Sequence, residues 1–140
     1  MPAVFESVGF NVVKLCKQYF NRLNVALNVF NLYEGQQNLL LMLWEEDGLE
    51  QAELTRRLGI EPASVSKGIE RMENAGFILR RPSPDDARAN RIYLTELGRS
   101  LEEPVNKAWF EVEEELLANM TTEERMLLRR LVLQMRENLK

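Results

Sequence analysis

The chain has 140 residues, of which 45% are hydrophobic and 29% charged, with a formal net charge of −4 at pH 7. This composition excludes a disordered chain, and no apolar run approaches the roughly 20 residues that span a bilayer, so we expect no membrane partner. With no histidine and one cysteine, a zinc site and a Ser-His or Cys-His nucleophile are excluded, and we expect no catalytic residues, metal or cofactor.

The negative charge is unevenly distributed. Residues 53–91 carry eight basic and six acidic side chains, whereas segments 1–52 and 92–140 are each acidic by three charges. Contact with phosphate depends on a local basic face rather than on net charge. The middle of the chain is therefore the candidate for binding a polyanion. The N-terminus lacks the features of a signal peptide, so we expect a cytoplasmic protein.

Hydrophobic spacing predicts two helices in the first third of the chain. From about Val8 to Phe30 apolar residues recur every three or four positions, which is typical of one face of a long amphipathic helix. The segment 36–46 is apolar nearly all round, which predicts a buried helix. Asp47-Gly48 then provides a glycine signal for its end.

Residues 51–75 have the pattern of a helix-turn-helix. A short helix at about 51–58 is followed by a turn at Gly59, and Pro62 stands at the favoured first position of a second helix. The inward face of that helix is predicted to hold Val65, Ile69 and Met72. Small and charged groups occupy its outer face: Ala63, Ser64, Lys67, Glu70, Arg71 and Asn74. Two short helices joined in this way indicate a helix-turn-helix.

A β-hairpin is predicted directly after the second helix. Phe77–Arg81 is strand-like, the segment 82–86 is rich in proline, serine and aspartate, and Arg88–Leu94 returns as a second strand. Arginines therefore lie on an exposed hairpin of an acidic protein, either as solvated groups or as contacts to a polyanion.

The C-terminal part is predicted to be two helices with wide apolar stripes. Thr95 is expected to cap one long helix that carries its stripe from Leu97 to Leu116. The T-x-x-E sequence at Thr121 is a capping box that opens a last helix. The stripes of residues 10–30 and 97–139 are too wide for one small domain to cover, so we expect a homodimer.

Three local patterns at these spacings resemble the MarR family of winged-helix transcriptional regulators. They are Leu54-Thr55-Arg56-Arg57-Leu58-Gly59-Ile60, the segment 63–73, and Asp86-Ala87-Arg88 with Leu94-Thr95-x-x-Gly98. The resemblance covers essentially the whole chain. It implies a mainly α (α+β) fold in a single domain, 1–140, with a winged helix-turn-helix at about 36–95 and dimerisation helices at about 8–33 and 96–140.

The resemblance also implies function. Members are ligand-responsive repressors that bind palindromic double-stranded DNA as homodimers, so we expect DNA contacts from Ser64, Ser66, Lys67, Arg71, Asp86, Arg88 and Arg91. The second helix is expected in the major groove, and Arg88, held by Asp86, in a narrow A·T-rich minor groove. Ala63 and Lys67 depart from the serine and arginine frequent in the family, which affects operator sequence rather than function class.

Two further sites are expected from the resemblance. Small aromatic effectors bind between the dimerisation and DNA-binding regions of relatives, where Tyr19, Phe20, Trp44 and Trp109 are candidates, although aromatic residues at helical spacing are more often core. One subfamily instead oxidises a cysteine of the first helix, which makes Cys16 a redox candidate; a buried structural cysteine is the commoner case. A winged-helix interaction module without DNA binding is the alternative from another class.

Overall fold

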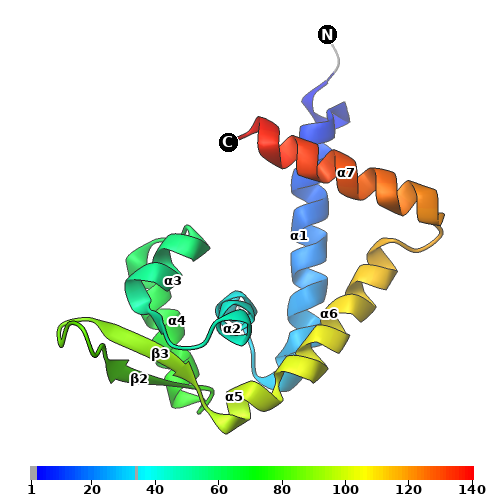
Figure 1. Ribbon diagram of the computed structural model, residues 1–140. Helices are drawn as coiled ribbons and strands as arrows, with labels where there is room; N and C mark the ends of the chain where they lie inside the picture. Colours follow the sequence, from blue (N-terminus) through cyan, green and yellow to red (C-terminus); the bar gives the residue numbers. More distant parts are fainter. Residues whose placement is uncertain (1–2, 34) are drawn as a thin grey trace.

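The structure, a computed structural model, describes residues 3–33 and 35–140. Figure 1 shows two parts that meet at helix α2 (Gln36–Glu45). A helical arm contains η1 (Val4–Glu6), α1 (Val8–Leu27), α6 (Glu102–Leu116) and α7 (Thr122–Asn138). A winged-helix lobe contains α2, α3 (Gln51–Leu58), α4 (Pro62–Asn74), α5 (Glu96–Ser100) and a small sheet. The expected fold class, mainly helical with a small antiparallel wing, is confirmed.

The sheet has three strands rather than the two expected. β1 (Leu49–Glu50), β2 (Ile78–Pro82) and β3 (Asn90–Leu94) are antiparallel in the order β1-β3-β2. The additional strand follows from the turn after α2, where Gly48 has a φ of 72° and Asp47 Oδ1 accepts hydrogen bonds from the N–H groups of Gly48 and Leu94. The turn lays the next two residues against β3.

The core lies where α2, α4 and the inner face of the sheet meet. Leu39, Leu40 and Leu43 of α2 are buried, as expected for a helix apolar nearly all round. The predicted inward face of α4 is confirmed, because Val65, Ile69 and Met72 are all buried. The outer face of α4 is therefore fixed in orientation by the burial of the opposite side.

The predicted long helix after Thr95 is wrong in one respect: it is two helices. Thr95 caps the start as expected, since its side chain accepts a hydrogen bond from the N–H of Gly98. The helix breaks at Leu101, between α5 and α6. Pro104 explains the break, because it has no N–H to donate to the carbonyl of Ser100 and its ring would collide with that carbonyl in a continuous helix.

The arm is held together mainly by α1 and α6, which pack along each other. Tyr19 and Trp109 meet edge to face with centroids 6.4 Å apart, and the guanidinium of Arg22 donates to both carboxylate oxygens of Glu115 at 2.8 and 2.6 Å. The predicted capping box at Thr121 is present and opens α7. The N-terminal helix ends earlier than expected, since residues Asn28–Phe30 form the short 3-10 helix η2.

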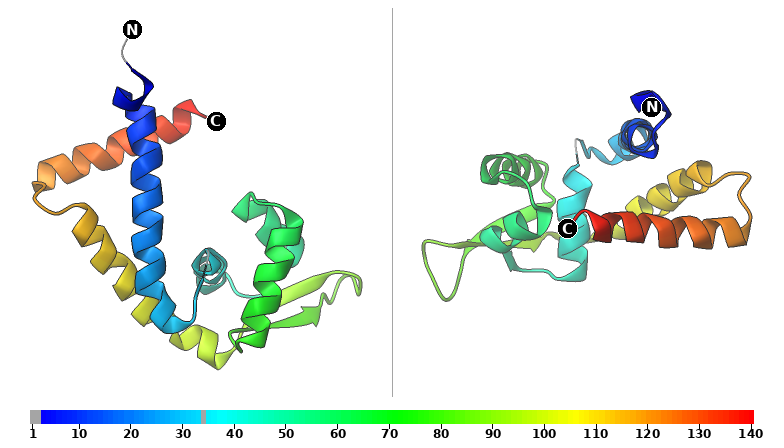
Figure 2. Two further views of the ribbon diagram at one scale, coloured as in Figure 1. Left: turned by 180° about the vertical axis from the view of Figure 1, so that it is seen from behind. Right: turned by 90° about the horizontal axis from the view of Figure 1, so that it is seen from above.

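Much of the apolar surface of the arm is uncovered. Figures 1 and 2 show α7 at the end of the arm that lies far from the sheet. Within the described ranges no α7 residue is buried, and large apolar side chains of both helices are exposed: Val8, Val13, Leu15, Leu127, Leu131 and Val132. None of the helices traced in residues 3–33 and 35–140 is long and apolar enough to cross a membrane.

Candidate nucleic-acid interface

Helix α4 presents a polar face built by the geometry of a 3.6-residue repeat. With Val65, Ile69 and Met72 buried, the opposite side of the helix is centred on Lys67, which is exposed. In the described part of the chain Lys67 makes no ion pair, so its ammonium group is available at the surface. Pro62 at the first helical position gives α4 its start without a side-chain cap.

The other predicted contacts of α4 lie on its two flanks. Ser64 borders the side that faces α1 and α2, where it lines a crevice with Phe20. Arg71 lies on the same flank, in a hollow of about 440 Å³ lined also by Asn24, Asn28, Tyr33 and Gln36. The expected row of Ser64, Lys67 and Arg71 is therefore present, but Arg71 stands at its border with the arm.

Ser66 lies on the opposite flank, toward α3. The side-chain amide of Gln51, the first residue of α3, donates a hydrogen bond to Ser66 Oγ at 3.0 Å. Sequence reasoning missed Gln51, because no local signal shows that two side chains fifteen positions apart meet across a helix-turn-helix.

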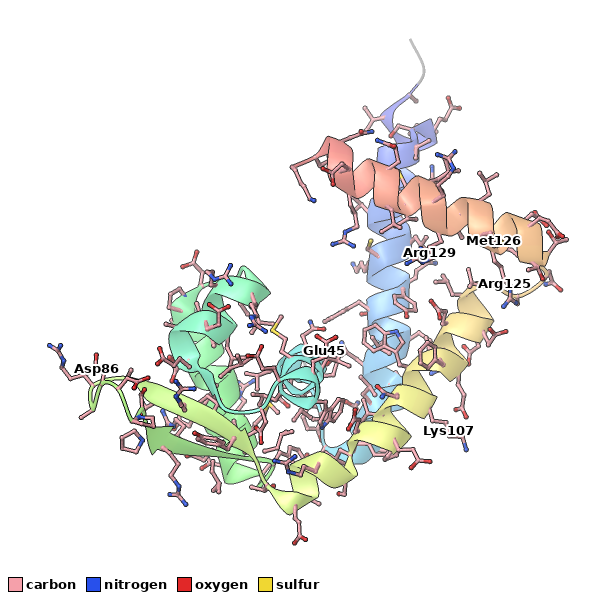
Figure 3. The ribbon with its side chains drawn as sticks, viewed as in Figure 1. Glu45, Asp86, Lys107, Arg125, Met126 and Arg129 are labelled. Atoms are coloured by element: carbon pink, nitrogen blue, oxygen red, sulfur yellow. The ribbon has the colours of Figure 1, made fainter. Side chains whose placement is uncertain are left out.

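The wing carries Arg88 at its tip. The Arg88 side chain is 93% exposed, and Asp86 Oδ1 accepts from both its backbone N–H at 2.9 Å and its Nε at 3.4 Å. Figure 3 shows Asp86 at the outer end of the hairpin. The expected pairing of Asp86 with Arg88 is confirmed, and it holds the guanidinium beside the loop while leaving most of it in solvent.

Arg91 has a different environment from Arg88. Its side chain is 30% exposed, and its Nη1 donates to the carbonyl oxygen of Gly48 at 3.0 Å. Its Nη2 lies 3.7 Å from a carboxylate oxygen of Glu50 and 3.6 Å from one of Asp85. Glu50 in turn accepts from the hydroxyl of buried Ser83 at 3.2 Å. Arg91 therefore ties the wing loop to β1.

We predict that Arg91→Ala loosens the wing rather than removing a phosphate contact. Amides of the wing loop should exchange hydrogen faster, in particular Ser83 and Ala89, whose N–H groups donate to Ala89 and Asp86 carbonyls. Binding to DNA should weaken on every sequence, with an unchanged salt dependence. If the slope of log affinity against log salt falls by about one unit, Arg91 contacts a phosphate directly and the prediction fails.

Three other arginines of the lobe, Arg56, Arg57 and Arg80, are committed to ion pairs. Arg56 and Arg57 both donate to Glu53, which lowers the pKa of its carboxyl to about 2, and Arg57 also reaches Glu46. Arg80 likewise donates to Glu73 at 3.0 and 3.2 Å and lowers the pKa of that carboxyl. These pairs join α3 to the end of α2 and α4 to β2, so the arginines serve the lobe's own structure.

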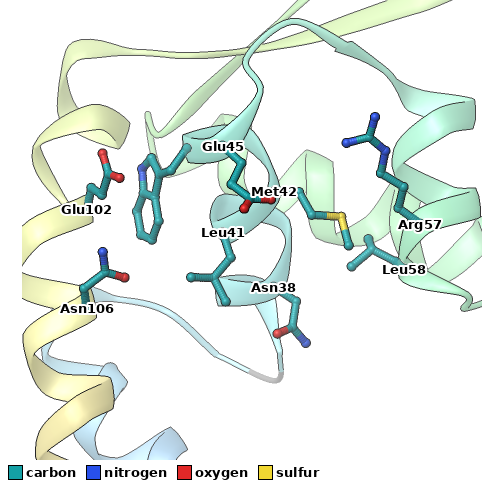
Figure 4. Close-up of a pocket in the computed structure, with 9 residues that line it drawn as sticks. Asn38, Leu41, Met42, Glu45, Arg57, Leu58, Glu102 and Asn106 are labelled. Carbon is teal, nitrogen blue, oxygen red and sulfur yellow. The ribbon is translucent and has the colours of Figure 1, made fainter. Parts of the chain in front are cut away.

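The four aromatic candidates for an effector site do not share a crevice. Trp44 lines a hollow of about 520 Å³ above α2, shown in Figure 4, and its Nε1 donates to the carbonyl oxygen of Gly98 at 2.9 Å. Phe20 lines the separate crevice of about 260 Å³ beside α4. Tyr19 and Trp109 pack against each other between α1 and α6. These residues therefore lie in three different places of one chain, and their role in binding an effector stays a prediction.

Cys16 is exposed on α1, so the commoner case of a buried structural cysteine does not apply within one chain. Lys14 and Lys17 are its cationic neighbours in sequence, and the Lys14 ammonium group lies 5.4 Å from the centroid of the Phe10 ring. The geometry thus gives the thiol access to solvent, while one of its supposed cationic neighbours is engaged elsewhere.

Comparison with known proteins agrees with the fold. The model of the MarR family matches residues 32–89. The chain is 32% identical over 106 residues to the uncharacterized HTH-type transcriptional regulator YdgJ of Bacillus subtilis, covering 76% of this chain and 65% of YdgJ. It is 31% identical over 102 residues to a second such regulator of that species, YwoH, covering 73% and 74% of the two chains.

Similarity in three dimensions extends over nearly the whole chain. A MarR-family regulator of Listeria monocytogenes, crystallised in complex with 26mer DNA, superposes with a TM-score of 0.83 at 20% identity, covering 96% of this chain and 89% of that one. The shared winged helix, the family match across α2 to the wing and the identity to YwoH together lead to one conclusion. The chain belongs to the MarR family of transcriptional regulators.

Proposed function

We propose that the protein is a repressor that binds a palindromic operator in double-stranded DNA as a homodimer and releases it when a small aromatic effector binds. The observation that supports the DNA-binding part of this proposal is that one lobe exposes two cationic side chains. Lys67 is exposed at the centre of the α4 face, and Arg88 is exposed at the wing tip. An α-helix fits the major groove and an extended arginine fits a narrow minor groove.

Support for the homodimer comes from the uncovered apolar surface of α1 and α7. Exposed side chains such as Leu15, Leu127 and Leu131 form faces that are costly to leave in water, at roughly 25 cal/mol per Å². A two-fold dimer places two copies of α4 at half-sites about one helical turn apart, which is the reason for a palindromic operator.

Support for an effector comes from the hollow above α2. It is bounded by Arg57 and Leu58 of α3 on one side and by Glu102 and Asn106 of α6 on the other (Figure 4), and Trp44 also lines it. A molecule bound there touches both the helix-turn-helix and the arm, so it can bias their relative arrangement. This couples occupancy to DNA affinity.

Selection of bound sequences from random DNA tests the proposal. The expected result is an enriched palindrome whose affinity falls steeply as salt rises, because phosphate contacts release counterions. Failure to enrich any sequence, together with negligible binding to mixed DNA at low salt, would favour a protein-interaction module instead.

We predict that alanine substitutions in the wing and in α4, the recognition helix, affect DNA binding in different ways. Arg88→Ala should weaken binding most on operators with A·T-rich flanks, because the variant loses the arginine that the narrow minor groove attracts. Asp86→Ala should cause a smaller loss in the same direction, since Asp86 only positions Arg88. Lys67→Ala should instead change which operator bases matter, by roughly 1–3 kcal/mol of discrimination.

The measurement is the affinity of each variant for operators with A·T-rich or G·C-rich flanks at two salt concentrations. Dimerisation and melting temperature should stay as in the wild type, because the wing tip contributes little to the core. Equal affinity of Arg88→Ala and wild type on the A·T-flanked operator would show that the hairpin is a solvated loop.

Cys16 is predicted to be dispensable for regulation. Cys16→Ser should bind the operator as the wild type does, and an organic hydroperoxide should release neither protein, since Lys14 interacts with Phe10 rather than the thiol. Electrophoretic mobility shift with and without peroxide measures both. Release of the wild type alone would establish the redox alternative.

A further inference from the structure

The hydrogen bond between Gln51 and Ser66 determines how the Ser66 hydroxyl of α4 can hydrogen-bond to an outside partner. A serine hydroxyl has one hydrogen to donate and lone pairs with which to accept. Gln51 Nε2 occupies a lone pair of Ser66 Oγ at 3.0 Å. Within residues 3–33 and 35–140 the hydroxyl donates to no acceptor, so its hydrogen remains for an outside partner.

The position of Gln51 in the fold favours this hydrogen bond. Gln51 is half-buried at the first position of α3, and the first turn is further secured where the hydroxyl of Thr55 donates to the Gln51 carbonyl at 2.9 Å. Gln51 also lines a hollow of about 320 Å³ between α3 and the wing, shared with Arg88 and Asn90. It thus lies between the two elements that carry the available cations. The acid in this hollow, Glu50, is already paired with Arg91 and Ser83.

We propose that Gln51 is a positioning residue for DNA recognition, which holds the Ser66 hydroxyl as a hydrogen-bond donor and so directs it to acceptor groups of the DNA. This inference rests on the proposed DNA binding by α4. Acceptors in the major groove are N7 and O6 of guanine, N7 of adenine and O4 of thymine, whereas the cytosine amine is a donor. With one of its lone pairs occupied by Gln51, the Ser66 hydroxyl therefore favours these acceptors over the cytosine amine at the base it meets.

A double-substitution cycle tests the inference on the full-length protein, with operator DNA chosen by selection from random sequence. Ser66→Ala should weaken binding about fivefold or more on the preferred sequence. Gln51→Met, which keeps the length of the side chain and removes the amide, should weaken it about threefold or more. In the Ser66→Ala background Gln51→Met should have no further effect, because Gln51 acts only through the hydroxyl.

Two readouts separate this role from a merely structural one. The salt slope should be the same in Gln51→Met and wild type, because no phosphate contact is lost. In Gln51→Glu the carboxylate can only accept, so the Ser66 hydroxyl donates its hydrogen bond to it and its oxygen is left to accept. Selection with this variant should then admit cytosine at one operator position. Ser64→Ala is the matched control: it removes a hydroxyl from the other flank of α4, and its effect should add to that of Gln51→Met.

Additive losses from Ser66→Ala and Gln51→Met, or an unchanged base preference in Gln51→Glu, would overturn the inference while leaving DNA binding in place. A wild-type protein that enriches no sequence would overturn the proposed function itself, and this inference with it. Circular dichroism of each variant checks that it is folded, and the conservative Gln51→Glu provides the second variant should Gln51→Met be unstable.

Discussion

Leu131→Asp is expected to separate the proposed homodimer into monomers and to abolish operator binding. Leu131 is exposed on α7, beside Leu127 and Leu128 at a shallow apolar groove that also includes Met120. Two-fold symmetry would bury two unpaired carboxylates in the interface, and each costs several kcal/mol. Dimerisation should weaken by at least about a hundredfold, since 1.4 kcal/mol corresponds to a factor of ten.

Sedimentation at micromolar concentration measures this effect. The wild type should sediment at twice the 16.3 kDa of one chain, and Leu131→Asp at the mass of a monomer or as an aggregate. Arg130→Asp is the matched control, because it places the same carboxylate on the neighbouring, more polar side of α7 and should leave the dimer intact. A well-folded wild-type monomer at this concentration would contradict the proposed dimer.

Features fixed by local chemistry could be predicted from the sequence. The start of α4 at Pro62, the capping box at Thr121 and the burial of Val65, Ile69 and Met72 depend on residues within a few positions of each other. The pairing of Asp86 with Arg88 is equally local, because it closes within the wing loop. In each case the residue types and their spacing contain the physical cause.

Features that depend on segments distant in sequence could not be predicted. The third strand exists because Asp47, at the end of α2, accepts from the N–H of Leu94 in β3. Arg91 approaches Asp85 of the wing loop, but it also contacts Gly48 and Glu50, which lie more than forty residues away in sequence. The sequence shows two arginines on a hairpin, and only the packing of β1 beside β3 distinguishes them.

The effector candidates illustrate the same limit. Periodicity correctly places Tyr19 and Phe20 on α1, but adjacent positions on a helix point about 100° apart. Tyr19 therefore meets Trp109 of α6, while Phe20 reaches the crevice beside α4. Aromatic content alone predicts hydrophobic contact, and which contact each ring makes depends on the helices that pack around α1.

Gly98 belongs to a sequence pattern and lies where two backbone segments approach closely. It ends the L-T-x-x-G pattern, and its N–H donates to Thr95 Oγ1 while its carbonyl accepts from Trp44. A Cβ built on Gly98 would collide with the carbonyl oxygen of Phe77. That carbonyl cannot easily move, because it accepts from the N–H of Thr95 at 3.0 Å and the Phe77 N–H donates to Met72 at the end of α4.

Gly98→Ala is therefore expected to destabilise the protein strongly, although alanine is the better helix former. Inserting a methyl into a packed site usually costs about 1–3 kcal/mol, and a collision with fixed backbone belongs at or above the upper end. We expect a loss of about 3 kcal/mol, seen as a melting temperature lower by roughly 6–12 °C. Urea unfolding at one fixed protein concentration measures the free energy, because dimerisation makes stability depend on concentration.

Gly68→Ala supplies the control that separates collision from helix propensity. Gly68 lies inside α4, where a built Cβ meets nothing within 4 Å, so alanine there should stabilise by about 0.5–1 kcal/mol. The two substitutions add the same methyl group to two helical glycines and should change stability in opposite directions. Unfolding of Gly98→Ala at the same urea concentration as Gly68→Ala, or at a higher one, would show that the backbone between α5 and the wing shifts readily to accept a methyl group. Glycine would then occur at this position of the pattern for a reason other than the collision.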